Sequence, residues 1–277
     1  MTEERGSSGG TGLPASIEAA WGLRARPVKG PKPGLSLARI VDAAVAVAAS
    51  EGLGGVSMGQ VAKDLGASTM SLYRYVSAKD ELYVLMQEAA MGPPPPLPAP
   101  ERGSGWREAL ARWACAQRRV FHRNLWMLRI PVSGPPVSPN SVAWWEQGLQ
   151  ALEETGLDAG EKVSVILLVN GFVRNEALLM GDLAAAVAAR GVPAQEVTDS
   201  QTRTLDRLVD PVRHPSLSRL LESGALGAPR EPDDEFGFGL ERVLDGIEVL
   251  VQSHSRPRSR SRSSSPSPSP SPSRSRV

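Results

Sequence analysis

The stretch VSMGQVAKDLGASTMSLYRYVSAKDEL, residues 56–82, decides the fold of this chain. It predicts two short helices that are joined by a tight turn. Ser57 is a good N-cap for the first helix, and Gln60 stands three residues later, as in a capping box. Gly66 can adopt the left-handed conformation that ends a helix, and Ser68 is placed to cap the second helix. The stretch therefore predicts a helix–turn–helix.

The second of these helices has an inward and an outward face. Leu72 and Val76 fall four residues apart and point inward. A helix–turn–helix lays its second helix in the major groove of DNA, with N-terminal residues near base edges. Several side chains are expected to point outward, toward bases or phosphates: Thr69, Met70, Ser71, Tyr73, Arg74 and Tyr75. The alternative is an ordinary helical hairpin whose tyrosines pack into a core, and spacing alone does not separate the two.

The same stretch resembles the TetR family of bacterial repressors. The family pattern is leucine–glycine, a short polar helix, leucine–tyrosine, an aromatic residue or histidine, then lysine and leucine. Its anchors here are Leu65, Gly66, Leu72, Tyr73, Tyr75, Lys79 and Leu82. The resemblance continues back through LARIVDAAVAVAASEGLGGVSM and covers about residues 35–91. It implies an all-α fold, with an N-terminal three-helix DNA-binding domain and a C-terminal helical bundle for ligand binding and dimerisation.

The resemblance also implies which side chains meet DNA. The positions that touch bases or their phosphates correspond to Thr69, Met70, Ser71 and Arg74, and those that grip the backbone correspond to Tyr73, Tyr75 and Lys79. Ser57, at the start of the motif, is expected at the same surface. Gly59 stands where some family members have a base-reading arginine, so the first helix lacks that side chain here.

Composition sets bounds on the class of protein. The chain has 277 residues, 41% of them hydrophobic and 22% charged, which is typical of a soluble globular protein. The net charge of +1 does not by itself indicate that the protein binds nucleic acid. A single cysteine, Cys115, excludes an intramolecular disulfide and favours a reducing compartment, so we expect the cytoplasm. The sequence shows neither an apolar signal segment nor an 18-residue apolar run, so we expect no membrane span.

The helical periods and the low-complexity segments predict five regions. Residues 1–34 form a flexible basic arm, either a minor-groove arm or a solvated linker. Residues 35–91 form the DNA-binding domain with a connecting helix, and 92–103 form a proline-rich linker. Residues 104–253 form the ligand-binding and dimerisation domain. Residues 254–277 form a disordered Arg/Ser/Pro tail that either adds attraction to DNA or only solubilises. Helices are predicted at 36–51, 78–91, 106–122, 124–130, 141–155, 158–190, 195–209, 216–221 and 235–252.

Two hypotheses concern the second domain, one about ligand binding and one about dimerisation. Aromatic walls with a few polar groups are typical of small-molecule pockets, so a planar amphipathic ligand is expected between Trp113, Phe121, Trp126, Trp144 and Asn170. The alternative is a core filled with aromatic residues. Apolar stripes on the long helix and the last helix could pair across a twofold axis, through Leu167, Leu178, Leu240, Leu244, Ile247 and Val251. The alternative is that both stripes pack inside one chain.

Other classes of function have less support. GFGFGLER has two glycines of a dinucleotide motif but lacks the third, and no strand precedes it. The sequence has no HExxH, GxSxG or Walker motif, and its three histidines are far apart. We therefore expect no enzyme, no catalytic or metal-ligating residue and no cofactor. The arginine–serine tail suggests an RNA-associated protein, but no RRM or KH signature accompanies it. The sequence predicts a homodimeric repressor that a small molecule releases from operator DNA, and a helix–turn–helix binder without a ligand remains the alternative.

Overall fold

The computed structural model describes residues 13–23, 34–96, 105–132, 134–228 and 232–255, and over these residues its regular elements are all helical. Of the arm predicted over residues 1–34, residues 13–23 and 34 are described, and they include the short helix α1 (Ala15–Ala20). The rest of the arm, most of the linker and nearly all of the tail lie outside the described residues. The α-helices are α1 (Ala15–Ala20), α2 (Leu37–Glu51), α3 (Met58–Asp64), α4 (Thr69–Tyr73), α5 (Lys79–Met91), α6 (Trp106–Arg123), α7 (Pro139–Ala151), α8 (Ala159–Arg190), α9 (Ala194–Leu208), α10 (Pro215–Glu222) and α11 (Pro232–Ser255). Three 3₁₀ turns join them: η1 (Leu53–Gly55), η2 (Leu125–Arg129) and η3 (Glu153–Thr155).

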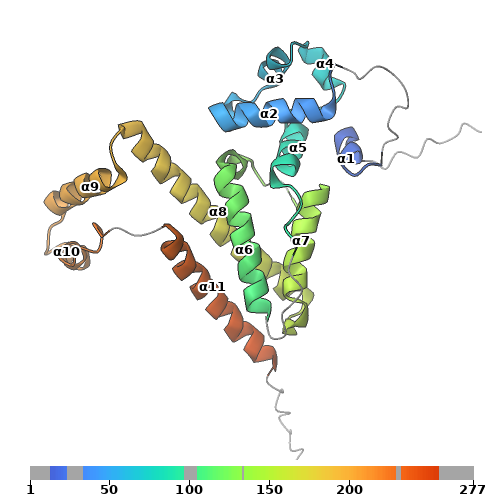
Figure 1. Cartoon of the computed structure of the whole chain (residues 1–277). Coiled ribbons are helices and arrows are strands. Elements are labelled where there is room, and N and C mark those ends of the chain that lie inside the picture. The colour runs from blue at the N-terminus through green and yellow to red at the C-terminus, as the bar shows by residue number, and fades with distance from the viewer. Residues whose placement is uncertain (1–12, 24–33, 97–104, 133, 229–231, 256–277) are drawn as a thin grey trace, which may run out of the picture.

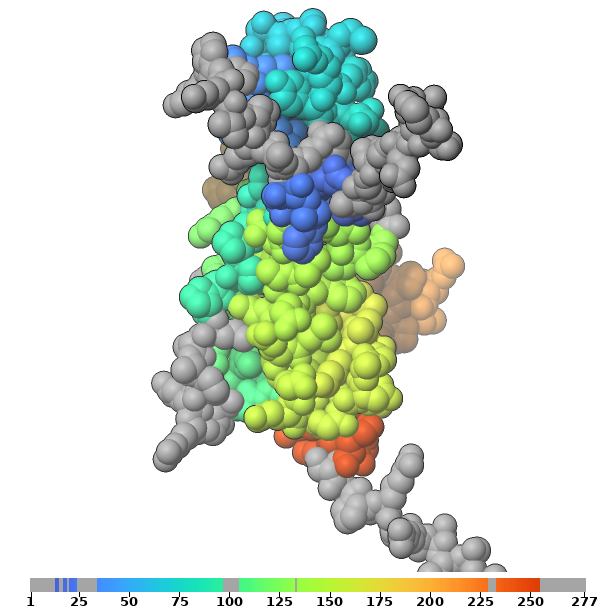
Figure 2. Space-filling model, turned by 90° about the vertical axis from the view of Figure 1, so that its right-hand side faces the viewer, coloured from blue at the N-terminus to red at the C-terminus, as the bar shows by residue number. Residues whose placement is uncertain are grey.

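The helices form two groups that α5 connects. Helices α2, α3 and α4 gather at one end of the molecule, and α5 runs from them to the bundle of α6, α7, α8 and α11 (Figure 1). Helices α9 and α10 project to one side of that bundle (Figure 1). Helix α1 packs on α5 and lies on the surface between the α2–α4 group and α7 (Figure 2). The predicted all-α architecture, a helix–turn–helix followed by a helical bundle, is confirmed.

The predicted caps form at the helix starts. The hydroxyls of Ser36, Ser57 and Ser68 each accept a hydrogen bond from the backbone N–H three residues later. Gly66, with φ of +62°, makes the turn of the motif. At Ser57 the capping box is only half formed: the Ser57 hydroxyl accepts from the Gln60 backbone N–H, and the Gln60 side-chain amide donates to Asp64 Oδ1 at 2.9 Å. Local side-chain chemistry therefore sets these boundaries, as the sequence predicted.

Helix α8 has two apolar faces. Its length and composition alone would allow it to cross a membrane, as is also true of core helices of soluble bundles. Val165, Ile166, Val169, Val173 and Ala177 are buried on one face, where α8 packs on α6, α7 and α11. Away from that face, α8 carries leucines that the described residues leave about half exposed. A second apolar face needs its own packing partner.

Candidate DNA interface and ligand domain

Helix α4 presents a side-chain face to solvent. Leu72 is fully buried and anchors the helix, whereas the side chains of Met70 and Tyr73 are 75% and 46% exposed. Arg74 follows as the exposed C-cap residue. Thr69 and Ser71 are half-buried, and the Ser71 hydroxyl lies 2.8 Å from that of Ser68. The outward orientation predicted for Met70, Tyr73 and Arg74 is confirmed.

Tyr75 departs from the predicted orientation. Its side chain is half-buried and its hydroxyl donates a hydrogen bond to the Leu35 carbonyl oxygen, at 3.1 Å. The ring therefore ties the end of the motif to the chain just before α2. A sequence pattern could not show this contact, because the two residues are 40 positions apart. The prediction that Tyr75 points outward is wrong, and its contact with DNA stays a prediction.

Two further predicted residues stand at helix starts. Ser57 is exposed while it caps α3. Lys79 is exposed in the first turn of α5, and its Nζ lies 5.3 Å from the centre of the Tyr83 ring. The N-cap of α5 is Ala78, which offers no side-chain acceptor to the first N–H groups of the helix. Backbone amides and Lys79 thus favour an anion at the same place.

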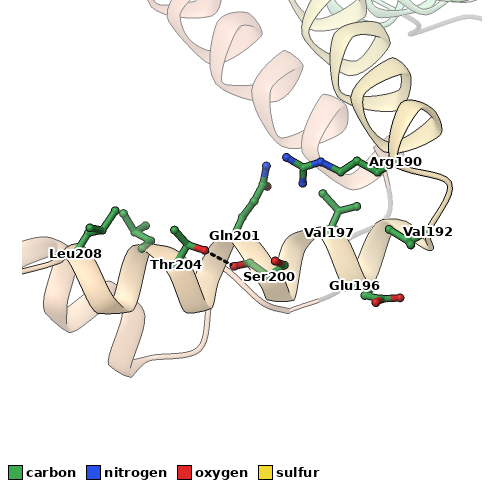
Figure 3. A pocket seen from close by; sticks show the side chains of 9 residues that line it. Arg190, Val192, Glu196, Val197, Ser200, Gln201, Thr204 and Leu208 are labelled. Atoms are coloured by element: carbon green, nitrogen blue, oxygen red, sulfur yellow. Dashed lines mark hydrogen bonds between the residues drawn. The ribbon is translucent and has the colours of Figure 1, made fainter.

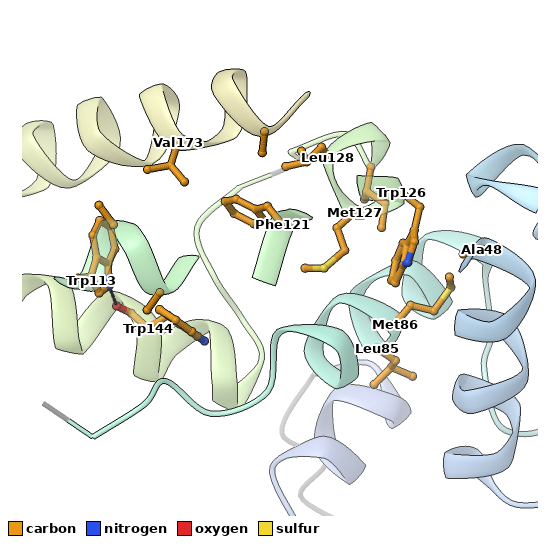
Figure 4. Packing of buried hydrophobic residues seen from close by; sticks show 14 of the residues in the cluster. Ala48, Leu85, Met86, Trp113, Phe121, Trp126, Met127, Leu128, Trp144 and Val173 are labelled. Atoms are coloured by element: carbon orange, nitrogen blue, oxygen red, sulfur yellow. Dashed lines mark hydrogen bonds between the residues drawn. The ribbon is translucent and has the colours of Figure 1, made fainter. Parts of the chain in front are cut away.

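The four aromatic residues that are predicted to bind the ligand are all buried (Figure 4). Trp113, Phe121, Trp126 and Trp144 are each at most 6% exposed. The indole N–H of Trp113 donates to the carbonyl oxygen of Trp144, at 2.9 Å. That of Trp144 donates to the carbonyl oxygen of Gly92, at 3.0 Å. Close packing explains these two tryptophans by itself, and their role as pocket residues stays a prediction.

Polar atoms are also present in this interior. The Asn170 amide donates to Gln117 Oε1 at 2.9 Å, and Gln117 is almost completely buried. The buried indole N–H of Trp126 has no acceptor among the described residues. Trp126 lies beside Met86 and Ala48 (Figure 4), where η2 meets the N-terminal group of helices. Trp126 therefore belongs to the junction between the two domains.

The described residues also form surface grooves, away from the buried aromatic residues. A groove of about 520 Å³ follows α9 and the end of α8 (Figure 3). It is lined by Arg190, Val192, Glu196, Val197, Ser200, Gln201, Thr204, Leu205 and Leu208. None of the predicted ligand residues is among them. This groove is therefore separate from the aromatic interior.

The predicted dimer residues divide into two sets. The first set is buried within the chain, at most 4% exposed, and comprises Leu240, Leu244 and Ile247. Their assignment to a dimer surface is therefore wrong, and the alternative of packing inside one chain holds for them. Leu167 is 54% exposed, and Leu178 and Val251 are half-buried. Exposed neighbours that the sequence prediction missed are Leu168, Phe238 and Val249.

An ion-pair cluster joins α6, α8 and α11. Arg118 and Glu176 are 14% and 11% exposed in their side chains and lie 3.0 Å apart. Arg118 also pairs with Asp233 at 2.5 Å and lies over the Phe236 ring, 4.4 Å from its centre. Burial opposes the charge on Arg118, but the hydrogen bonds that Arg118 donates to Glu176 and Asp233 outweigh this effect and raise the pKa of Arg118 above its ordinary value. Sequence reasoning missed this cluster because its members lie on three separate helices.

A second set of contacts joins the connecting helix α5 to α7. The backbone N–H of Asn140 donates to both carboxylate oxygens of Glu88, at 2.8 and 3.0 Å. The Asn140 amide donates to the Glu88 carbonyl oxygen, at 3.0 Å. Just beyond α5, Gln147 donates to the Pro95 carbonyl oxygen, at 2.6 Å. These hydrogen bonds attach α5 and the segment just after it to α7.

Comparisons with known proteins agree with this architecture. Residues 40–86 match the family described as bacterial regulatory proteins, tetR family. Residues 97–251 match the family described as tetracyclin repressor-like, C-terminal domain. The chain is 38% identical to the HTH-type transcriptional repressor DrrR1 of Streptomyces coeruleorubidus over 246 residues, which cover 88% of this chain and 89% of DrrR1.

A second relative and a solved structure extend the comparison. An HTH-type transcriptional regulator of Saccharopolyspora erythraea is 30% identical over 173 residues, which cover 62% of this chain and 71% of that protein. The structure of the TetR family protein ActR of Streptomyces coelicolor in complex with actinorhodin superposes with a TM-score of 0.65 and 26% identity, covering 80% of this chain and 99% of ActR. With the exposed face of α4 and the helical bundle behind it, these matches establish that the chain belongs to the TetR family of DNA-binding transcriptional regulators.

Proposed function

We propose that the chain acts as a homodimeric repressor, which binds operator DNA through α4 and leaves it when a small molecule occupies the helical domain. The observation that carries the proposal is the exposed face of α4, where Met70 and Tyr73 project beside a fully buried Leu72. The relative DrrR1 is named a repressor, and ActR has been solved with a bound small molecule, actinorhodin. Because its partner is DNA and its cysteine is unpaired, we expect the protein in the cytoplasm.

DNA contacts would divide by chemistry. Met70 and Thr69 would meet base edges, with the Ser71 hydroxyl beside them, because α4 is too short to bring more than its first turn into the groove. Arg74 and Tyr73 would reach phosphates or purine edges. Lys79 and Ser57 would contact phosphates beside the helix starts of α5 and α3. Tyr75 would act through its hydrogen bond to Leu35, by holding the motif against α2.

Pairing of two chains would supply a second recognition helix. One short helix reads few base pairs, so helix–turn–helix proteins bind two half-sites as dimers. The exposed face of α8 and α11 suits this pairing, since Leu167, Leu168, Phe238 and Val249 are all more than half exposed. A groove of about 630 Å³ runs between the two helices and includes Leu168, Val243 and Gly246. Side chains of a partner would fill that groove in a four-helix interface.

Release would follow from a shift in population between two spacings of the recognition helices. A ligand among the aromatic residues of α6, α7 and α8 would favour one arrangement of α7. The Glu88–Asn140 contacts would pass that arrangement to α5, and α5 carries the helix–turn–helix. We place the boundary between the two functional domains within residues 92–103.

The test is binding of the purified full-length protein to DNA upstream of its own gene, across a salt series. Saturable binding that prefers one sequence is expected, and Arg74→Ala should weaken it. Arg203→Ala is the matched control, because Arg203 is exposed on α9 and the variant has the same net charge. Equal affinity of wild type and Arg74→Ala, or binding that ignores sequence, would remove α4 from the interface.

A further inference from the structure

Arg174 is a half-buried cation without a counter-charge. It lies midway along α8, which packs on α6. Its guanidinium carbon lies 5.6 Å from the centre of the buried Phe121 ring on α6. Among the described residues no carboxylate forms an ion pair with it. Burial lowers the pKa of Arg174 from its ordinary value, because the guanidinium has lost water and no carboxylate offsets that loss.

The other described arginines of this domain that are at least partly buried, Arg107, Arg112 and Arg118, each pair with an acidic side chain. Arg118 pairs with Glu176 and Asp233. Arg107 pairs with three acids of α11, and Arg129 pairs with Asp182. A half-buried charge without an ion pair costs folding free energy. Arg174 is therefore more readily explained by a binding role than by folding.

The surroundings of Arg174 offer donors and aromatic surface. One turn earlier on α8, Asn170 donates to Gln117, which lies one turn before Phe121 on α6. Past Phe121, the buried Trp126 N–H lacks an acceptor, and Met127 lies between these two rings (Figure 4). This strip thus combines a cation and an unused donor with aromatic rings. Its chemical complement is a flat molecule that carries a negative charge.

We propose that Arg174 binds the acidic group of the ligand, so that the domain prefers planar aromatic anions, such as carboxylates and sulfonates, over neutral analogues. This inference rests on the proposed function, whose ligand it assigns to a chemical class. The planar guanidinium can bind such a group with two parallel charge-assisted hydrogen bonds. The site differs from the surface grooves along α9 and between α8 and α11, neither of which Arg174 lines.

The test uses two fluorescent probes with the same rings. Anilinonaphthalene sulfonate carries a negative charge, and N-phenyl-naphthylamine lacks the sulfonate. Titration of the full-length wild-type protein should give one sulfonate site per chain, at least about tenfold tighter than binding of the neutral probe, a factor equal to about 1.4 kcal/mol. Arg174→Gln should bring the two affinities close together and should leave binding of the neutral probe unchanged.

Two further variants keep the test decisive. Arg203→Gln makes the same change in net charge on exposed α9 and should keep the wild-type preference. Arg174→Lys retains the charge, so it should keep part of the preference even if the glutamine variant does not fold. A wild-type protein that binds neither probe, or shows no preference, overturns the proposal, as does a preference that survives Arg174→Gln. Operator binding without any probe is measured in parallel. Its failure would contradict the proposed function, whereas loss of probe preference alone would contradict only the ligand class.

Discussion

Asn140 holds Glu88 by two of its groups: its backbone N–H donates to the carboxylate at 2.8 Å, and its side-chain amide donates to the backbone carbonyl oxygen at 3.0 Å. Glu88 lies near the end of α5, and Asn140 lies in the first turn of α7. The carboxylate thus sits at the N-terminus of α7, where the helix dipole favours negative charge. This contact joins the DNA-binding helices to the ligand domain at one defined point.

Glu88→Ala should therefore weaken the contact between α5 and α7. The loss of charge-assisted hydrogen bonds should lower the free energy of unfolding by about 1.5–3 kcal/mol, measured by urea denaturation. Glu146→Ala is the control, because Glu146 is exposed on α7 and, within the described part of the chain, accepts a hydrogen bond only from Gln150. That variant should stay within about 0.5 kcal/mol of wild type. Equal losses of stability in the two variants would show that the Glu88–Asn140 contact contributes no more to folding than an exposed hydrogen bond.

Glu176→Ala should lower the free energy of unfolding more than Glu88→Ala does. It removes the less exposed of the two carboxylates that pair with the largely buried Arg118, and the pair with Asp233 remains. Breaking a buried pair typically costs 3–5 kcal/mol, and the remaining partner should reduce the loss to about 3 kcal/mol. Asp182→Ala breaks the exposed pair with Arg129 and should cost less than about 1 kcal/mol. Thermal denaturation of both variants would contradict this ranking if Asp182→Ala were the less stable one.

Helix ends and apolar stripes were predictable from the sequence, and contacts between helices were not. Ser36, Ser68 and Asp158 cap their helices through groups only a few residues away, so local sequence holds all the information. The orientation of Tyr75 depends on Leu35, and the burial of Leu244 depends on how α11 meets its neighbours. Both require the positions of residues that are distant in the chain.

The decrease in folding stability at acidic pH should depend in part on Asp245. Hydrogen bonds from Arg107 and Arg242 hold the pKa of Asp245 below its ordinary value of 3.8. Because the folded-state pKa is the lower one, this stabilisation is present above the ordinary value and is lost as the pH falls through the folded-state value. In Arg107→Gln, the pKa of Asp245 should move up toward 3.8, which a carbon NMR titration of the carboxyl group measures. An unchanged titration would show that Arg107 does not act on this carboxylate in solution.

The proposed dimer face predicts a change of oligomeric state. Leu167→Glu should convert the dimer to a folded monomer, because it places a charge in an interface that excludes water. Light scattering after size-exclusion chromatography measures the mass. Val212→Glu is the control, since Val212 is 89% exposed and lies outside the α8–α11 face. A Leu167→Glu variant that remains dimeric would place the interface elsewhere.

Leu244→Ala provides the contrast within α11. Leu244 is fully buried in the chain, and truncation of such a leucine costs about 2–5 kcal/mol. The variant should therefore lose stability by urea denaturation in proportion to the cavity it creates. A neutral effect on stability combined with loss of the dimer would restore Leu244 to the dimer surface.

Hydroxyl-radical footprinting of the wild-type protein on DNA upstream of its own gene tests the central claim most directly, with Arg74→Ala and Arg203→Ala beside it. The account predicts two protected half-sites whose centres lie one or more helical turns of about 10 base pairs apart. It also predicts that Arg74→Ala loses both half-sites and that Arg203→Ala keeps them. Protection of a single segment, or a footprint that survives Arg74→Ala unchanged, would contradict the account of α4 as the recognition helix of a dimeric regulator.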